Sequence, residues 1–152
     1  MSLTVAALQM VSAPEPARNL ASAARLLQQA ADQGAMLAVL PEYFAVLGHR
    51  DTDKLALREP FGAGPMQDFL ASTAQRLGLW IVGGTLPLVA DSPAHVRNST
   101  LVFAPDGRCV ARYDKIHLFR FERGAERFDE GRTIEPGQTP VQLDVPDAQG
   151  RP

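Results

Sequence analysis

The sequence has few of the features that mark secreted, membrane-spanning or nucleic-acid-binding proteins. Its 152 residues include one cysteine, Cys109, which excludes an internal disulfide framework and predicts a reducing, cytoplasmic location. No apolar stretch approaches the roughly 20 residues of a membrane span, and the first residues lack the basic and apolar regions of a signal peptide. A formal net charge of -2 offers no basic surface to phosphates, so no nucleic acid and no membrane is predicted as a partner.

What the sequence does contain is typical of one ordinary globular domain, with 45% hydrophobic and 21% charged residues and no repeat. The first half alternates strand-like and helical patterns, which predicts an α/β fold. Strands are expected over residues 3–10, 36–40 and 79–84, and helices over 17–33 and 65–77. The first strand, helix and strand form a unit whose two strands should be parallel neighbours.

The second half predicts β-strands instead. Residues 99–104 and 109–113 are strand-like and flank the turn Pro105-Asp106-Gly107, so a hairpin is expected. A long charged loop should cover 120–137, and a short strand 141–145. Because the sequence then stops on a turn signal, we expect a chain cut from a longer domain.

Glu42 occupies the most suggestive position in the first half. It follows the apolar run 36–40 and Pro41, and proline cannot donate a hydrogen bond to a sheet, so the strand should end there. Open α/β sheets place their ligands at the carboxyl ends of such buried strands. Glu42 is therefore a candidate general base. The alternative, a surface glutamate at a strand corner, is not excluded by position alone.

Four motifs, in this order, resemble the nitrilase, or carbon–nitrogen hydrolase, superfamily. They are Leu-Pro-Glu-Tyr-Phe at 40–44, Gly-Gly-Thr at 83–85, Arg-Asn-Ser at 97–99, and Arg-Tyr-Asp-Lys-Ile-His-Leu-Phe at 112–119. Within it the chain looks most like the Nit-type amidases, which include ω-amidases and deaminated glutathione amidases. The resemblance implies an α-β-β-α sandwich, truncated here, with residues 1–152 as the N-terminal part of a single domain.

The resemblance also implies an activity and three site residues. The family hydrolyses non-peptide carbon–nitrogen bonds with a glutamate, a lysine and a cysteine, and its amidases release ammonia from a small amide. By motif, Glu42 is the general base and Lys115 stabilises the oxyanion, roles that suit a base beside a nucleophile and a fixed positive donor. Many members add a second glutamate that orients the substrate. Glu130 is the choice here, with Glu122 and Glu126 as alternatives.

The nucleophile is expected outside this sequence. The family's cysteine follows a strand just beyond a segment like 141–152, whereas Cys109 lies outside the matched motifs and is expected to be a small, half-buried residue. These 152 residues alone should then be inactive. Two alternatives are a catalytically dead ligand- or partner-binding module of the same fold, and an unrelated doubly wound α/β binding domain, which leaves 112–119 unexplained.

No cofactor and no metal is predicted. His49, Asp51 and Asp53 lie in an expected loop, 43–64, but lack the spacing of a known metal motif and are typical of a solvated, charged segment. The predicted partner is a small-molecule amide substrate. The resemblance further implies a homo-oligomer when the protein is complete.

Overall fold

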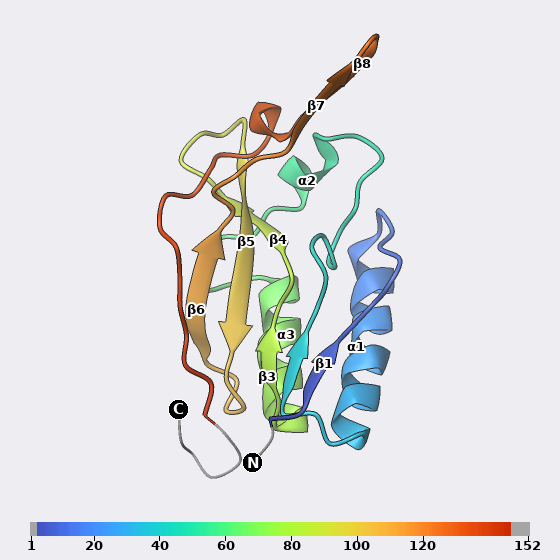
Figure 1. Ribbon diagram of the computed structural model, residues 1–152, viewed down its shortest axis with the longest axis vertical. Coiled ribbons are helices and arrows are strands. Elements are labelled where there is room, and N and C mark those ends of the chain that lie inside the picture. The colour runs from blue at the N-terminus through green and yellow to red at the C-terminus, as the bar shows by residue number, and fades with distance from the viewer. Residues whose placement is uncertain (1–2, 147–152) are drawn as a thin grey trace.

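Residues 3–146 are described by a computed structural model, in which one layer of helices covers one face of a sheet and a two-stranded hairpin projects beyond it (Figure 1). In chain order the elements are β1 (Val5–Ala7), α1 (Pro16–Asp32), β2 (Leu37–Val39), α2 (Asp53–Ala56), α3 (Pro65–Leu77), β3 (Trp80–Val82), β4 (Leu86–Val89), β5 (Val96–Phe103), β6 (Cys109–Asp114), β7 (Arg120–Arg123), β8 (Glu126–Asp129) and a 3-10 turn, Glu130–Arg132.

The main sheet confirms the predicted α/β fold. Its strands follow the order β1-β2-β3-β5-β4, and β6 pairs with β5. β1, β2 and β3 are parallel, as the strand–helix–strand unit predicts, and β5 is antiparallel to β3, β4 and β6. The predicted hairpin is β5–β6. Parallel strands end at one edge of a sheet, so the segments after β2 and β3 lie next to each other.

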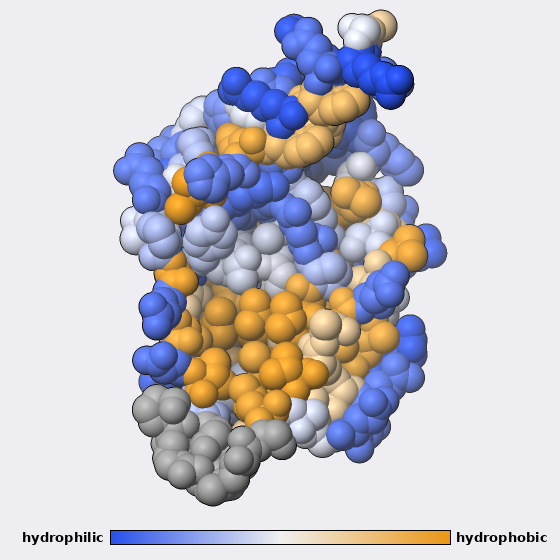
Figure 2. All heavy atoms as spheres, in the orientation of Figure 1, coloured by the Kyte–Doolittle hydropathy of each residue, from blue (hydrophilic) through white to orange (hydrophobic). Residues whose placement is uncertain are grey.

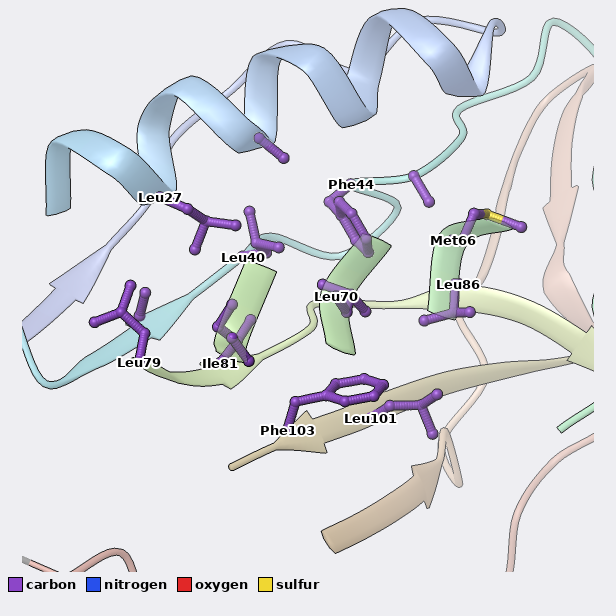
Figure 3. Close-up of a cluster of buried hydrophobic side chains, with 14 of the residues drawn as sticks. Leu27, Leu40, Phe44, Met66, Leu70, Leu79, Ile81, Leu86, Leu101 and Phe103 are labelled. Carbon is purple, nitrogen blue, oxygen red and sulfur yellow. The ribbon is translucent and has the colours of Figure 1, made fainter. Parts of the chain in front are cut away.

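Both long helices begin and pack as their sequences indicate. Pro16 and Pro65 start α1 and α3 at a position that needs no backbone N–H, and Gly78 ends α3 in a left-handed conformation with a φ of +64°. Leu27 of α1 and Leu70 of α3 are fully buried against the sheet (Figure 3). Burial of each such side chain contributes about 1.5–3 kcal/mol.

The opposite face of the sheet is apolar and carries no helix of the described chain. Side chains alternate along a strand, so the buried Ile81 faces the helices while Val82 faces away. Val39, Val82 and Val102 align across β2, β3 and β5, and each is partly exposed. Figure 2 shows the resulting apolar surface, which we call the open face. The described residues thus form one helical layer packed on one main sheet.

We expect residues 1–152, expressed alone, to self-associate or to unfold with low cooperativity, because the open face would remain in water. Sedimentation velocity at several concentrations tests this. Val102→Lys should weaken association by placing a charge on the open face, whereas Val11→Lys adds the same charge at a loop residue that is 94% exposed and should not. A wild-type monomer with one sharp unfolding transition would count against this expectation.

Two segments differ from the sequence prediction. The expected loop 120–137 contains the β7–β8 hairpin, in which Phe121 pairs with Phe128 and Gly124 turns the chain with a φ of +59°. Most residues of the two strands are charged, so the sequence shows no alternation of apolar and polar residues that would have predicted a hairpin. The strand predicted over 141–145 is wrong: these residues have no regular structure, because no strand of the described chain takes up their backbone hydrogen bonds.

Two short elements were not predicted. β4 contains Pro87, which is tolerated because β4 ends the strand order and a proline at a sheet edge sacrifices little. α2 is a single turn within the expected loop 43–64. The turn signal at 149–152 lies outside the described residues. Within residues 3–146, no helix has the length and apolar character that crossing a bilayer requires.

Candidate active site

Glu42 lies in a sharp turn immediately beyond β2. The next residue, Tyr43, has a φ of +56°, a left-handed conformation that is uncommon for a residue with a Cβ. Its backbone N–H donates to Thr85 Oγ1 at 2.8 Å, which holds this turn against the segment after β3. Such backbone strain persists where surrounding contacts enforce it, and it often marks a functional site.

Gly84 permits the two strand ends to meet. A Cβ at this position would overlap the carbonyl oxygen of Pro41, and the φ of Gly84 is +50°. A Cβ at Gly83 would in turn press on the side chain of Leu70. These glycines allow two backbone segments to approach closely, and their role is to place the turn of Glu42 beside β3.

Lys115 follows the last residue of β6 and is held on both sides by its backbone. Its N–H donates to the carbonyl of Asn98 at 2.9 Å, and its carbonyl accepts from the N–H of Gly137 at 2.9 Å. Its Nζ reaches Glu42 Oε1 at 2.9 Å, and Glu130 Oε1 and Oε2 at 3.1 and 2.9 Å. The structure thus brings together all three predicted site residues.

Glu130 is the most buried of the three, with a side chain only 4% exposed. Besides Lys115, it accepts a hydrogen bond from the Tyr43 hydroxyl at 2.8 Å and from the Phe119 N–H at 2.7 Å. Burial alone would raise the pKa of Glu130, but the hydrogen bonds from Lys115, Phe119 and Tyr43 together lower it. Glu130 is therefore ionised at neutral pH.

The ionisation of the surrounding groups follows from the same contacts. Burial disfavours the charged form of Lys115, but its hydrogen bonds to Glu130 and Glu42 outweigh this and raise its pKa. Burial, followed by the hydrogen bond to Glu130 and its charge, raises the pKa of Tyr43. Lys115 is therefore a permanent cation, and Tyr43 stays a neutral donor. The arrangement can hold a negative charge close to Lys115.

Asn98 is a site residue that the sequence reasoning did not assign. It lies on β5, is 3% exposed, and donates from Nδ2 to Glu42 Oε1 at 2.8 Å. The motif at 97–99 contains it, but that motif gave it no role. The available signal was a polar amide in a strand of mostly buried residues, because a buried polar group needs a partner.

A pocket of about 310 Å³ opens beside these residues. It is lined by the side chains or backbone of Val39, Leu40, Glu42, Val82, Gly84, Thr85, Thr100, Tyr113 and Lys115. Val39 and Val82 belong to the open face, so the pocket lies at one end of that face. The side chain of Glu42 is 46% exposed there, which leaves it accessible to a reacting group.

The competing glutamates lie elsewhere. Glu122 and Glu126 are exposed on the β7–β8 hairpin, where Glu122 pairs with Arg127 at 3.1 Å. Among the residues described, the carboxylates that contact Lys115 are those of Glu42 and Glu130. The geometry therefore favours Glu130 over both alternatives.

Cys109 is placed at the wrong end of β6 to act with Lys115. It begins the strand that ends at Asp114, five residues away and thus about 16 Å along the strand. The residue is exposed rather than half-buried as predicted, because it lies at the strand start beside the hairpin turn. The partial desolvation that its thiol does experience raises the pKa, which disfavours the reactive thiolate. Within residues 3–146, no group of three or more histidine, cysteine, aspartate or glutamate side chains could hold a metal ion.

We expect Glu130→Gln to lower the free energy of unfolding by about 3 kcal/mol at neutral pH, because Lys115 loses a buried charged partner. The lowered pKa of Glu130 stabilises the fold above the ordinary value of 4.5, and this contribution is lost as pH falls through the folded pKa. Denaturant unfolding between about pH 6 and 3 should therefore show a weaker pH dependence in the variant. Glu126→Gln should keep the wild-type slope. Equal slopes for Glu130→Gln and wild type would contradict this assignment.

Fold and site together define a class: a mixed α/β sheet that presents a glutamate–lysine–glutamate cluster at the ends of its strands. The sequence model of the carbon–nitrogen hydrolase family matches residues 4–148 of this chain. The chain belongs to the carbon–nitrogen hydrolase family, as the four motifs indicated.

The chain is 42% identical over 135 residues to a deaminated glutathione amidase of Synechocystis sp. (strain PCC 6803 / GT-S), covering 88% of this chain and 49% of that protein. It is 30% identical over 147 residues to the omega-amidase NIT2 of Homo sapiens, covering 95% and 51%. The crystal structure of Saccharomyces cerevisiae Nit3, a member of branch 10 of the nitrilase superfamily, matches with a TM-score of 0.77 and 25% identity, covering 93% and 51%. The chain spans about half the length of the curated relatives it matches.

Proposed function

We propose that residues 1–152 supply the general base and the oxyanion-binding cation of an amidase that releases ammonia from a small amide. The observation that carries this proposal is the 2.9 Å hydrogen bond between Lys115 Nζ and Glu42 Oε1 beside an open pocket. A base and a fixed cation within reach of one point are what acyl transfer needs. The names of the matched relatives support an ω-amide or deaminated glutathione as the substrate.

In the acylation step, Glu42 takes the proton of a cysteine thiol, and the thiolate attacks the amide carbon. The carbonyl oxygen becomes an oxyanion, which the ammonium of Lys115 stabilises. The carbon–nitrogen bond then breaks as Glu42 returns its proton to the leaving nitrogen, so that ammonia departs and a thioester remains. The raised pKa of Lys115 keeps its charge in place throughout.

In the deacylation step, Glu42 takes a proton from water, and the hydroxide attacks the thioester carbon. Lys115 stabilises the second oxyanion, the carbon–sulfur bond breaks, and the thiolate recovers a proton from Glu42. A carboxylic acid leaves. The contacts of Glu130 support a role in holding Lys115, since both of its oxygens accept hydrogen bonds from protein donors.

The thiol comes, in this proposal, from a cysteine outside residues 1–152, because Cys109 lies at the far end of β6. We use the name complete enzyme for residues 1–152 joined by the polypeptide that supplies this cysteine. That polypeptide would place its sulfur at the pocket beside Glu42, within about 3–3.5 Å of the amide carbon.

We expect the complete enzyme to release ammonia from short ω-amides or from deaminated glutathione, and residues 1–152 alone to release none. Ammonia is measured directly, with the acid product identified by mass spectrometry. Cys109→Ala in the complete enzyme should keep turnover within about twofold, as is usual for a change away from a functional site. Replacement of the supplied cysteine by alanine should abolish it.

Two results would overturn the proposal. Loss of turnover in Cys109→Ala, with the supplied cysteine dispensable, would make Cys109 the nucleophile. Tight binding of these amides with no hydrolysis by the complete enzyme would favour a ligand-binding module of the same fold.

A further inference from the structure

The buried side-chain amide of Asn98 donates a hydrogen bond to the carboxylate of Glu42. Its side chain belongs to β5, where it is 3% exposed, and Nδ2 donates to Glu42 Oε1 at 2.8 Å. An ionised carboxylate can only accept hydrogen bonds, so the nitrogen of the amide must face it. The two residues are 56 positions apart in sequence, and strand packing alone brings them together.

The backbone of the same residue holds Lys115. The Asn98 carbonyl accepts from the Lys115 N–H at 2.9 Å, while the Asn98 side chain binds Glu42. Asn98 therefore sets the position of the base and of the cation relative to each other. Any change in its side chain acts on Glu42 while leaving the backbone contact to Lys115 available.

The contacts distinguish the two oxygens of Glu42. Oε1 accepts from Asn98 Nδ2 at 2.8 Å and from Lys115 Nζ at 2.9 Å. Within residues 3–146, no hydrogen-bond donor reaches Oε2. Oε1 is thus occupied by two donors, one of them a cation, and Oε2 is the oxygen left to take a proton.

We propose that Asn98 is a positioning residue that fixes the rotamer of Glu42, so that Oε2 is the basic atom that meets the thiol. This inference rests on the proposed function. Without Asn98, a carboxylate whose side chain is 46% exposed could rotate about its side-chain bonds, and its free oxygen would no longer be held in one direction.

Comparison with Asn19, the other asparagine of the chain, argues against a purely structural role. Asn19 is 1% exposed and bonds only to backbone: it accepts from the Ala13 N–H and donates to the carbonyls of Ala13 and Ala45. Such contacts tie loops together. Asn98 instead directs its donor at a half-exposed side chain, which the fold itself does not require to be fixed.

Other charged groups near Glu42 must be separated from the effect of Asn98. Lys115 contacts Glu42 directly, and Glu130 lies behind Lys115. Tyr43 and Lys54 face the cluster from the chain after β2, with Lys54 Nζ 5.7 Å from the centre of the Tyr43 ring. Asn98→Leu alters none of these charges and adds none, so a shift in the pH dependence of turnover in that variant reports on Glu42.

The test uses Asn98→Leu and Asn98→Asp in the complete enzyme, with Asn19→Ala as the control for loss of a buried asparagine. Asn98→Leu should lower kcat about 10–100-fold with KM changed less than about threefold, because the reacting atoms are displaced but the amide still binds. In the profile of kcat against pH, the acidic limb of this variant should move to higher pH by about one pH unit, because the carboxylate of Glu42 loses a hydrogen bond. Asn98→Asp should move it further, because a second carboxylate faces Oε1.

Asn19→Ala should lower thermal stability without moving the acidic limb. If the Asn98 variants keep the wild-type limb and a kcat within twofold of Asn19→Ala, Asn98 is structural and the inference fails. Asn98→Asp differs from wild type at one heavy atom, so its kcat at the pH optimum remains informative if Asn98→Leu does not fold. Failure of the proposed function shows differently: Glu42→Gln would then retain turnover, whereas failure of this inference alone leaves Glu42→Gln inactive.

Discussion

Glu42→Gln is expected to lower the rate of ammonia release by the complete enzyme about 10³–10⁴-fold. A general base accelerates a reaction by up to about 10⁴-fold, and the side-chain amide of the introduced glutamine cannot take a proton. The fold should persist. The Gln oxygen can accept the hydrogen bonds that Asn98 and Lys115 donate to Glu42 Oε1 at 2.8 and 2.9 Å. Single-turnover measurements should show that acylation, the first proton transfer, is the step that is lost.

Glu126→Gln is the matched control, since it makes the same change on the exposed β8 strand and should leave turnover unchanged. Unfolding midpoints of both variants should lie close to that of the wild type. Near-normal turnover by Glu42→Gln would remove Glu42 from the mechanism and, with it, the proposed function.

Lys115→Met is expected to lower turnover about 10²–10³-fold, the usual effect of removing one oxyanion donor. It should also destabilise the protein by about 3–5 kcal/mol, because Glu130 stays buried without its cation. Methionine is chosen since it keeps much of the length of the side chain without its charge. Chemical denaturation and steady-state kinetics measure the two effects separately.

The double variant Lys115→Met/Glu130→Gln distinguishes catalysis from stability. Removing the stranded carboxylate should recover most of the lost stability, since the pair is replaced by two neutral groups. Turnover should remain as low as in Lys115→Met. Recovery of activity together with stability would show that Lys115 serves the fold alone and would contradict its role at the oxyanion.

Local patterns in the sequence were sufficient for the elements that depend on short-range chemistry. Pro41 ends the strand before Glu42, and apolar spacing gives α1 and α3, since each effect acts within a few residues. The motifs at 40–44 and 112–119 singled out Glu42 and Lys115, which lie 2.9 Å apart in the structure although 73 positions separate them. The β7–β8 hairpin was not predicted from the sequence, because most residues of both strands are charged.

Contacts between distant segments were decided only by the tertiary structure. Glu130 differs from Glu122 and Glu126 in that the 3-10 turn buries it against Tyr43, 87 positions away. No spacing rule predicts that pairing, because it depends on how β2, β5 and β6 are ordered in the sheet. The same strand order places Asn98 against Glu42 and Cys109 at the far end of β6. Sequence by itself therefore indicated the family and singled out Glu42 and Lys115 as candidates. The orientation of these side chains, their partners and the open face beside them follow from the packing of strands remote in the chain.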